Sequence, residues 1–325
     1  MQCLAWSEDG EKLASGSAEG SIRIWSMEKI AASVIIQSTS NDKNSKVVSS
    51  SNSSVELVSG GHSRTVNQLQ WCPFDSNVLA SCSNDKTVKI WEISQNQPNI
   101  LTIETEIEIL TLSWNPSKPI LAVGTKDDQI LLYQLADNFK TANLIESLKF
   151  TSEVNEISWS ADGNDMAVAL GIGIVEIYRS NEKIQSLKAH TADCFCVRFK
   201  GNELLAVGSS DAQITLWSRT CEEKTFTCFR VLNRMEWPIR TLSFSHDAEF
   251  LAVGSEDPFI AIEHINTGSL VAKVSTGKAS SEAKAGIPIN SVTWHPSKHI
   301  LAFAGSEVDD RTGRPTGSIK LFGLC

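Results

Sequence analysis

Residues 61–92 read GHSRTVNQLQWCPFDSNVLASCSNDKTVKIWE, and three short segments of this stretch alternate apolar with polar residues. They are Leu69-Gln70-Trp71, Leu79-Ala80-Ser81 and Val88-Lys89-Ile90-Trp91. Turn-forming residues such as Asn84-Asp85-Lys86 separate them. Alternation with a period of two, in segments rich in β-branched and aromatic residues, is typical of short antiparallel strands.

The same order of segments recurs in seven copies along the chain. The first aromatic residues of the copies are Trp6, Trp71, Trp114, Trp159, Phe199, Phe244 and Trp294. The first interval is 65 residues and the later ones lie between 40 and 50, close to the period of β-propeller blades. One small sheet cannot bury both of its faces, whereas seven sheets packed around an axis can. We therefore predict an all-β fold in which residues 1–325 form a single seven-bladed propeller.

Charge and composition exclude several classes of protein. The chain of 325 residues has 38 acidic and 29 basic residues, for a net charge of −9, whereas phosphate binding requires a positive field. No apolar run approaches the length of about 18–20 residues that a membrane-spanning helix needs. The eight cysteines form no C-x-x-C pair, and no secretory signal opens the chain. We expect an intracellular protein without metal, cofactor or membrane contact.

The repeat resembles the WD repeat of the WD-repeat β-propeller family, and the resemblance covers nearly the whole chain. It implies buried hydrogen-bonded sets of a His, a turn Asp, a Ser or Thr and a Trp. In copy two this set is His62, Asp85, Ser81 or Ser83, and Trp91; in copy five it contains His190, Asp211 and Trp217. Such sets are structural, because buried polar groups without partners cost about 1–3 kcal/mol each.

The chain begins within the inner strand of copy one and ends after the third strand of copy seven. WD propellers usually take the outer strand of the last blade from residues ahead of copy one. We therefore expect that this closing strand is missing from the chain, through truncation or because the last blade has three strands.

Five further runs resemble the WD-repeat subunits of THO transcription–export complexes, and the general WD pattern does not require them. They are residues 153–159, 193–197, 237–247, 254–260 and 318–324. This resemblance implies a nuclear, non-catalytic subunit that contacts large helical THO-like subunits and, indirectly, a DEAD-box RNA helicase. The assembly would couple transcription to messenger-RNA packaging and export.

No catalytic motif is evident. The chain has no phosphate-binding G-x-x-x-x-G-K-[ST] loop, and Gly171-Ile172-Gly173 fits a hairpin turn. His246 and Asp247 follow an inner strand, where polar residues are ordinary turn formers. We expect a protein that is not an enzyme.

Candidate partner-binding residues lie four positions before each inner-strand aromatic, near the mouth of the channel by family geometry. These positions are Gln2, Asn67, Leu110, Asn155, Phe195, Arg240 and Asn290. Hydration of the channel and satisfaction of loop backbone are the alternative role for them. Trp237 is a further candidate, because strand packing does not require an aromatic before Pro238 and Trp is frequent at binding hot spots. A Trp folded back over its blade is the alternative there.

Residues 37–54 are half Ser or Thr and are expected to form a flexible insert between blades one and two. Basic residues near Trp237 and in a later insertion suggest a local patch for RNA or an acidic partner. They are Arg230, Arg234, Arg240, Arg311 and Arg314. Any direct contact with RNA would be local.

Two functions fit the sequence. The first is a scaffold subunit of a THO-like complex. The alternative is a peptide-binding WD-repeat adaptor of a ubiquitin ligase or of a chromatin complex, which would hold a short peptide on the top face.

Overall fold

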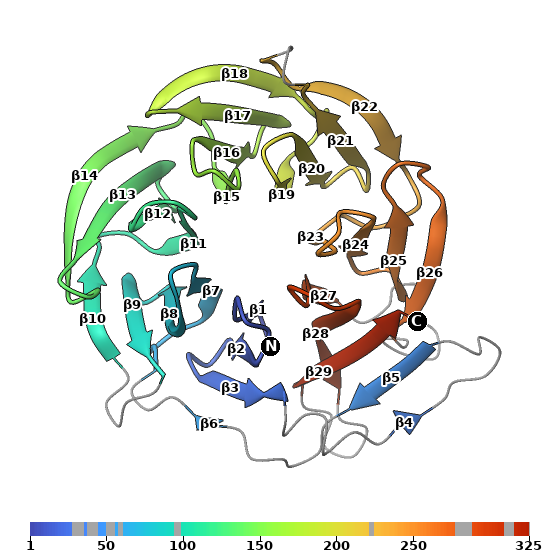
Figure 1. Ribbon diagram of the computed structural model, residues 1–325, viewed down its shortest axis with the longest axis horizontal. Coiled ribbons are helices and arrows are strands. Elements are labelled where there is room, and N and C mark those ends of the chain that lie inside the picture. Colours follow the sequence, from blue (N-terminus) through green and yellow to red (C-terminus); the bar gives the residue numbers. More distant parts are fainter. Residues whose placement is uncertain are drawn as a thin grey trace.

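The computed structural model describes residues 1–27, 36–37, 45–49, 56–57, 61–93, 99–220, 224–276, 288–308 and 315–324. Seven antiparallel sheets surround a central channel (Figure 1). The seven-bladed all-β propeller predicted from the repeats is thus confirmed. The described residues include no helix long and apolar enough to cross a membrane.

The strands of each blade follow one another from the channel outward. Blades one to three are β1 (Cys3–Trp6), β2 (Lys12–Gly16), β3 (Ile22–Ser26) and β6 (Glu56–Leu57); β7 (Val66–Cys72), β8 (Asp75–Ser83), β9 (Thr87–Glu92) and β10 (Asn99–Glu104); and β11 (Ile109–Trp114), β12 (Ile120–Thr125), β13 (Gln129–Ala136) and β14 (Thr141–Lys149). Blades four and five are β15 (Val154–Trp159), β16 (Asp165–Leu170), β17 (Ile174–Arg179) and β18 (Glu182–Lys188); and β19 (Cys194–Lys200), β20 (Leu204–Ser209), β21 (Ile214–Ser218) and β22 (Thr227–Leu232). Blade six is β23 (Thr241–Phe244), β24 (Phe250–Gly254), β25 (Phe259–His264) and β26 (Leu270–Ser275).

Blade seven has five strands, and two of them come from the N-terminal part of the chain. Its order is β27 (Ile289–Trp294), β28 (Ile300–Val308), β29 (Pro315–Leu324), β5 (Ser45–Ser49) and β4 (Ile36–Gln37). Figure 1 shows β5, in blue, beside the red β29. In the register, Leu321 lies opposite Val48 and Phe322 opposite Val47.

The expectation that the closing strand is missing was therefore wrong. The strand comes from within the segment expected to be a flexible insert. Ladder hydrogen bonds join backbone groups, so the exposed edge of β29 can pair with a Ser-rich segment as well as with an apolar one. Residues 38–44 and 50–54 of the expected insert lie outside the described residues.

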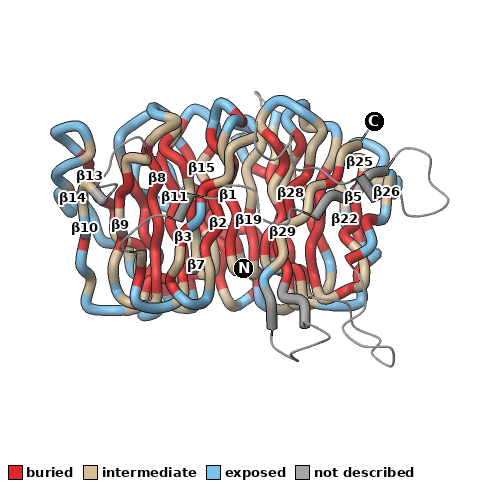
Figure 2. The backbone as a smooth tube through the Cα atoms, turned by 90° about the horizontal axis from the view of Figure 1, so that it is seen from below, coloured by how far each residue is buried: buried red, intermediate tan, exposed pale blue. Residues whose placement is uncertain are grey.

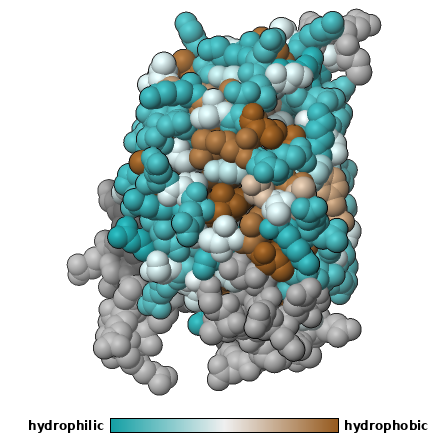
Figure 3. Space-filling model, turned by 90° about the vertical axis from the view of Figure 1, so that its left-hand side faces the viewer, coloured by the Kyte–Doolittle hydropathy of each residue, from teal (hydrophilic) through white to brown (hydrophobic). Residues whose placement is uncertain are grey.

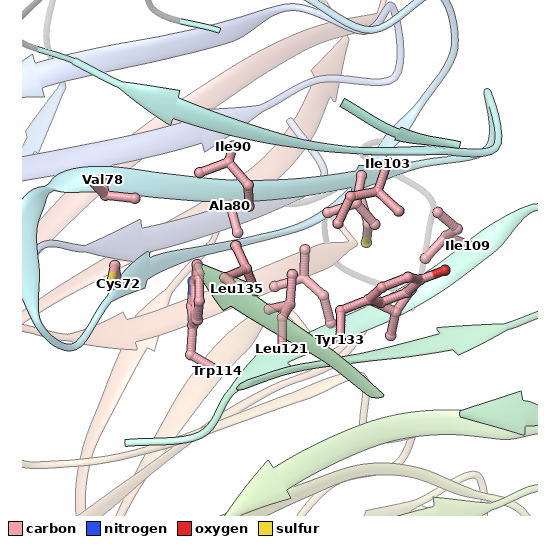
Figure 4. Packing of buried hydrophobic residues seen from close by; sticks show 14 residues of the cluster. Cys72, Val78, Ala80, Ile90, Ile103, Ile109, Trp114, Leu121, Tyr133 and Leu135 are labelled. Atoms are coloured by element: carbon pink, nitrogen blue, oxygen red, sulfur yellow. The ribbon is translucent and has the colours of Figure 1, made fainter. Parts of the chain in front are cut away.

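The core lies between adjacent blades. Trp114, Leu121 and Tyr133 of blade three pack against Ala80, Ile90 and other apolar residues of blade two (Figure 4). Figure 2 shows buried residues along the middle of the strands, with exposed residues mainly at the loops of the two faces. Each interface between blades is thus a small hydrophobic core, as the radial arrangement requires.

Indole groups of the inner strands bind the preceding blade. The Nε1–H groups of Trp71 and Trp114 donate to the backbone oxygens of Ala5, at 2.9 Å, and Gln70, at 3.3 Å. Trp159 donates to Ser113 in the same way, and Trp6 donates to Thr293 across the junction of blades one and seven. This repeated bond explains the Trp at the end of four inner strands, whereas the buried Nε1–H of Trp294 has no hydrogen-bond partner among the described residues.

Polar side chains of one inner strand also accept hydrogen bonds from backbone N–H groups of the next. The Gln70 side chain accepts from Trp114 at 2.8 Å, and the hydroxyl of Ser158 accepts from Phe199 at 2.9 Å. Ser243 accepts from Trp294 at 3.0 Å, and Ser291 accepts from Leu4 at 3.1 Å. The polar residues that alternate with apolar ones in the inner strands therefore join the blades.

We expect Val47→Pro combined with Val48→Pro to open blade seven. Proline lacks the N–H that a ladder needs. At about 1 kcal/mol for each lost hydrogen bond, the free energy of unfolding should fall by about 2–4 kcal/mol. Hydrogen exchange should accelerate at residues 320–324, which face β5, and stay unchanged in β12. Unchanged exchange in β29 would contradict the pairing with β5.

Candidate functional site

The seven channel-mouth positions predicted from the sequence line one cavity of about 440 Å³. Inner-strand side chains from every blade reach it, because each blade points its first strand toward the axis (Figure 1). The structure therefore brings together Gln2, Asn67, Leu110, Asn155, Phe195, Arg240 and Asn290. Trp237 is absent from this lining.

Three asparagines of this set link adjacent blades. The amide of Asn67 donates to the backbone oxygen of Ile109 at 2.6 Å, and that of Asn155 donates to Cys194 at 2.9 Å. Asn290 donates to Met1 at 3.0 Å, across the junction of blades seven and one. These contacts favour the alternative, structural role for the asparagines. Partner contact through them stays a prediction.

A partly buried ion pair also lines the cavity, and sequence reasoning missed it. The guanidinium of Arg198 lies 2.5 Å from the carboxylate of Glu156, which also accepts the N–H of Val197 at 2.9 Å. Burial raises the pKa of Glu156, although Arg198 and Val197 oppose that change. In the sequence, the only indication of this ion pair was that Glu156 and Arg198 both occupy polar positions of inner strands in neighbouring blades.

The loop before β23 presents Trp237 at the surface. The carboxylate of buried Asp257 accepts the backbone N–H groups of Glu236 and Trp237, each at 3.2 Å, and the hydroxyl of Ser255 at 2.6 Å. The Trp237 side chain is 36% exposed. The indole is therefore not folded fully over its blade. The backbone of Trp237 is held in place by Asp257.

Asp257 is a second residue that sequence reasoning passed over. In its Ser-x-Asp pattern, the Ser255 hydroxyl accepts the Asp257 N–H at 2.9 Å. The same bond joins Ser83 to Asp85 at 3.0 Å. The repeated Ser-x-Asp pattern could have identified Asp257 from the sequence.

Most of the predicted arginine patch is engaged within the protein. Arg240 forms an ion pair with Glu256, and Arg234 lies 2.8 Å from Glu263. Arg230 donates to the backbone oxygens of Asn266 and Thr267. Arg311 and Arg314 lie outside the described residues. The arginines near Trp237 are thus partly neutralised, and RNA contact stays a prediction.

The set around His62 contains the residues expected from the sequence. His62 Nδ1 lies 2.9 Å from Asp85 Oδ2, and Nε2 lies 2.7 Å from the Ser81 hydroxyl. Trp91 donates to the same hydroxyl at 2.8 Å. Of the two serines considered, Ser81 is the one that joins His62 to Trp91.

In the set around His190, the bridging hydroxyl group comes from a different strand of the blade than in the set around His62. His190 Nδ1 lies 3.0 Å from Asp211, as expected, and Nε2 lies 3.1 Å from the hydroxyl of Thr215. Trp217 donates to that hydroxyl at 2.8 Å. The hydroxyl therefore comes from β21 in this blade, because Val207 occupies the position equivalent to Ser81.

Both histidines dock on a glycine of the preceding blade. Gly20 and Gly173 adopt positive φ, of 85° and 75°, in hairpin turns. A Cβ on either would lie 2.0 Å from the His62 oxygen or 2.3 Å from the His190 oxygen. Only glycine allows this approach, so the two sets also fix the packing of neighbouring blades.

Comparison with known proteins matches the chain to WD-repeat propellers. Residues 67–237 match the family model of the WDR19 first beta-propeller, residues 1–26 that of the WD domain, G-beta repeat, and residues 200–295 that of the anaphase-promoting complex subunit 4 WD40 domain.

Among curated relatives, THO complex subunit 3 of Arabidopsis thaliana is 32% identical over 100% of this chain and 92% of its own. WD repeat-containing protein AAC3 of Dictyostelium discoideum is 28% identical over 98% of this chain, which spans 64% of that protein. The crystal structure of the Myceliophteria thermophila Cps50 (Swd1) beta-propeller domain superposes with a TM-score of 0.76, at 17% identity, over 99% of this chain and 96% of its own.

We expect stability to fall as the pH drops below about 6.5, the ordinary pKa of histidine. Burial lowers the pKa of His62 despite the attraction of Asp85, and burial also lowers the pKa of His295. The unfolded chain therefore binds more protons at these sites as the pH falls, which destabilises the folded state. Urea unfolding at several pH values between about 7.5 and 5.5 measures the slope. His62→Asn should reduce it, and an unchanged slope would exclude His62 as a source.

Proposed function

Because the chain belongs to the WD-repeat β-propeller family, we propose that it is a non-catalytic scaffold subunit of a THO-like complex in the nucleus. The fold and the family support a scaffold or interaction role. The observation that carries the finer proposal is the 32% identity to THO complex subunit 3, over the whole chain and 92% of that relative. Its function would then be to couple transcription to messenger-RNA packaging and export, together with large helical subunits and, indirectly, a DEAD-box RNA helicase.

The architecture suits a scaffold because the residues that stabilise the ring differ from the loop residues that can contact a partner. The apolar residues between blades and the polar residues of the inner strands are used for packing and for bonds between blades. Loops on a rigid ring remain available for partners. The loop that carries Trp237 meets this description, since Asp257 holds its backbone while the indole is partly exposed.

The outer edge of blade three is a second exposed surface. Leu144 and Ile145 of β14 are 53% and 48% exposed. Figure 3 shows apolar residues, in brown, on the side of the ring where Figure 1 places β14. An edge strand with exposed apolar side chains can contact another protein. The proposal therefore needs a test that separates the Trp237 loop from this edge.

A peptide-binding adaptor is the alternative function. The cavity of about 440 Å³ favours it, because Phe195 and Arg240 offer an apolar and a charged contact beside the polar asparagines. The match of residues 200–295 to the anaphase-promoting complex subunit 4 WD40 domain is consistent with an adaptor of a ubiquitin ligase. A short peptide would then bind on the channel axis.

Affinity purification of the tagged protein from nuclear extract, with mass spectrometry of stoichiometric partners, distinguishes the two functions. We expect large helical THO subunits and a DEAD-box helicase, retained after nuclease treatment because the contacts are between proteins. Recovery of ubiquitin-ligase subunits or chromatin enzymes without THO subunits would support the alternative and reject the proposal.

We expect Trp237→Ala to weaken the binding of the THO subunit recovered by this purification at least tenfold, since a partly exposed Trp on a fixed loop is a typical hot spot. The midpoint of thermal unfolding should change little. Leu144→Ala is the matched control for loss of an exposed apolar side chain, and it should leave affinity unchanged. The reverse pattern, measured by biolayer interferometry, would place docking on the edge of blade three.

A further inference from the structure

Two loops of neighbouring blades bring a pair of histidines and a carboxylate together. His246 and Asp247 follow β23 in blade six, and His299 precedes β28 in blade seven. His299 Nε2 lies 2.7 Å from Asp247 Oδ2, and the rings of the two histidines lie 4.7 Å apart between centroids. One nitrogen of each histidine and one oxygen of Asp247 all lie within 4.8 Å of one another.

The geometry of the turn requires Asp247 but does not require a histidine at position 246. In the Ser245-His246-Asp247 turn, Asp247 Oδ1 accepts the Ser245 hydroxyl at 2.5 Å and the Glu249 N–H at 3.1 Å. The same turn occurs in blade four, where Asp162 accepts the hydroxyl of Ser160 at 2.7 Å. The residue between Ser160 and Asp162 is alanine, so a histidine is not needed to form this turn.

The ligand atoms are held in place before any ligand arrives. The bonds from Ser245 and Glu249 occupy Oδ1 of Asp247 and leave Oδ2 facing His299. The His299 ring contacts Phe250 and Trp294 edge to face, with centroid distances of 5.4 and 6.2 Å. His246 and Asp247 are exposed and His299 is partly buried, so the cluster is accessible from solvent.

We propose that His246, Asp247 and His299 form a binding site for a divalent transition metal ion, with Zn²⁺ as the ion that fits best. Two imidazoles and one carboxylate are the donors that Zn²⁺ takes in many three-ligand sites, with water in the fourth position. Hard ions such as Mg²⁺ and Ca²⁺ prefer oxygen ligands, and soft sites are built from thiolates. The ligand set therefore selects an ion that binds imidazole.

The charges around the cluster are compatible with a cation. Burial raises the pKa of Asp247, but hydrogen bonds from Ser245, Glu249 and His299 lower this pKa by more. Lys200 also interacts with this carboxylate: burial lowers the pKa of Lys200, and the attraction of Asp247 opposes that change.

A metal ion at this position would join blades six and seven. An ion that binds the folded state in preference to the unfolded chain stabilises it in proportion to the logarithm of the metal concentration over the dissociation constant. Blade seven is also the blade completed by β5. The site would therefore stabilise the ring near its closure.

The test is titration of the untagged full chain with ZnCl₂ by isothermal calorimetry. Cys228 is an exposed free thiol, so Cys228→Ser serves as the background for every variant. We expect one Zn²⁺ per chain and a thermal midpoint that rises with ZnCl₂. His246→Ala and His299→Ala should each weaken binding at least tenfold and abolish the rise.

Two controls separate the cluster from unspecific binding. His264→Ala removes a histidine elsewhere in blade six, and Asp162→Asn removes the aspartate of the matching turn in blade four; both should bind Zn²⁺ as the background does. Asp247→Asn should not. Circular dichroism without metal checks that each variant folds, and His246→Gln and His299→Gln replace any alanine variant that does not.

The spectrum of bound Co²⁺ gives a second readout, because its visible bands report the ligands directly. Bands that disappear in His299→Gln support the site. Binding that survives loss of both histidines, several weak sites of equal affinity, or no binding at millimolar ZnCl₂ would each overturn the proposal.

Discussion

The free edge of each inner strand is the constraint on which the rest of this propeller depends. One edge of the strand pairs with the second strand of its blade, and the other faces the channel, where its N–H groups need acceptors. The preceding blade supplies them. Gln70 accepts from Trp114, Ser158 from Phe199 and Ser243 from Trp294, and indoles such as Trp71 likewise donate to backbone oxygens of the preceding blade. Bonds of this kind join neighbouring blades around the ring, so that each blade they connect supports the next.

The same argument applies at the outside of the last blade. β29 would have an unpaired edge if blade seven ended with it, and β5 pairs along residues 320–324. Together with the bonds from Leu4 to Ser291 and from Trp6 to Thr293, this strand holds the N-terminal and C-terminal parts of the chain together. Closure thus rests on both the inner and the outer strands of blade seven.

These demands also decide which residues remain for recognition. At the channel mouth, Asn67, Asn155 and Asn290 use their amides to join blades, and Arg240 pairs with Glu256, whereas Phe195 lines the same cavity with an apolar side chain. Among the described residues, no hydrogen bond joins the partly exposed indole of Trp237 to a neighbouring blade, although Asp257 holds its backbone. The contrast separates residues that maintain the ring from residues that are available to a partner.

The sequence by itself determined the fold, the number of blades and the His, Asp and Trp members of the polar sets around His62 and His190, whereas the structure decided which hydroxyl joins them, Ser81 in one set and Thr215 in the other. It could do so because strand alternation and the spacing of the aromatics are local properties that repeat. Only the tertiary structure decided that residues 45–49 close blade seven, because backbone pairing at an edge leaves little trace in side-chain composition. It also decided that Glu156 meets Arg198, and that His246 meets His299 from a different blade. These pairs are remote in sequence, and their approach follows from the packing of whole blades around the axis.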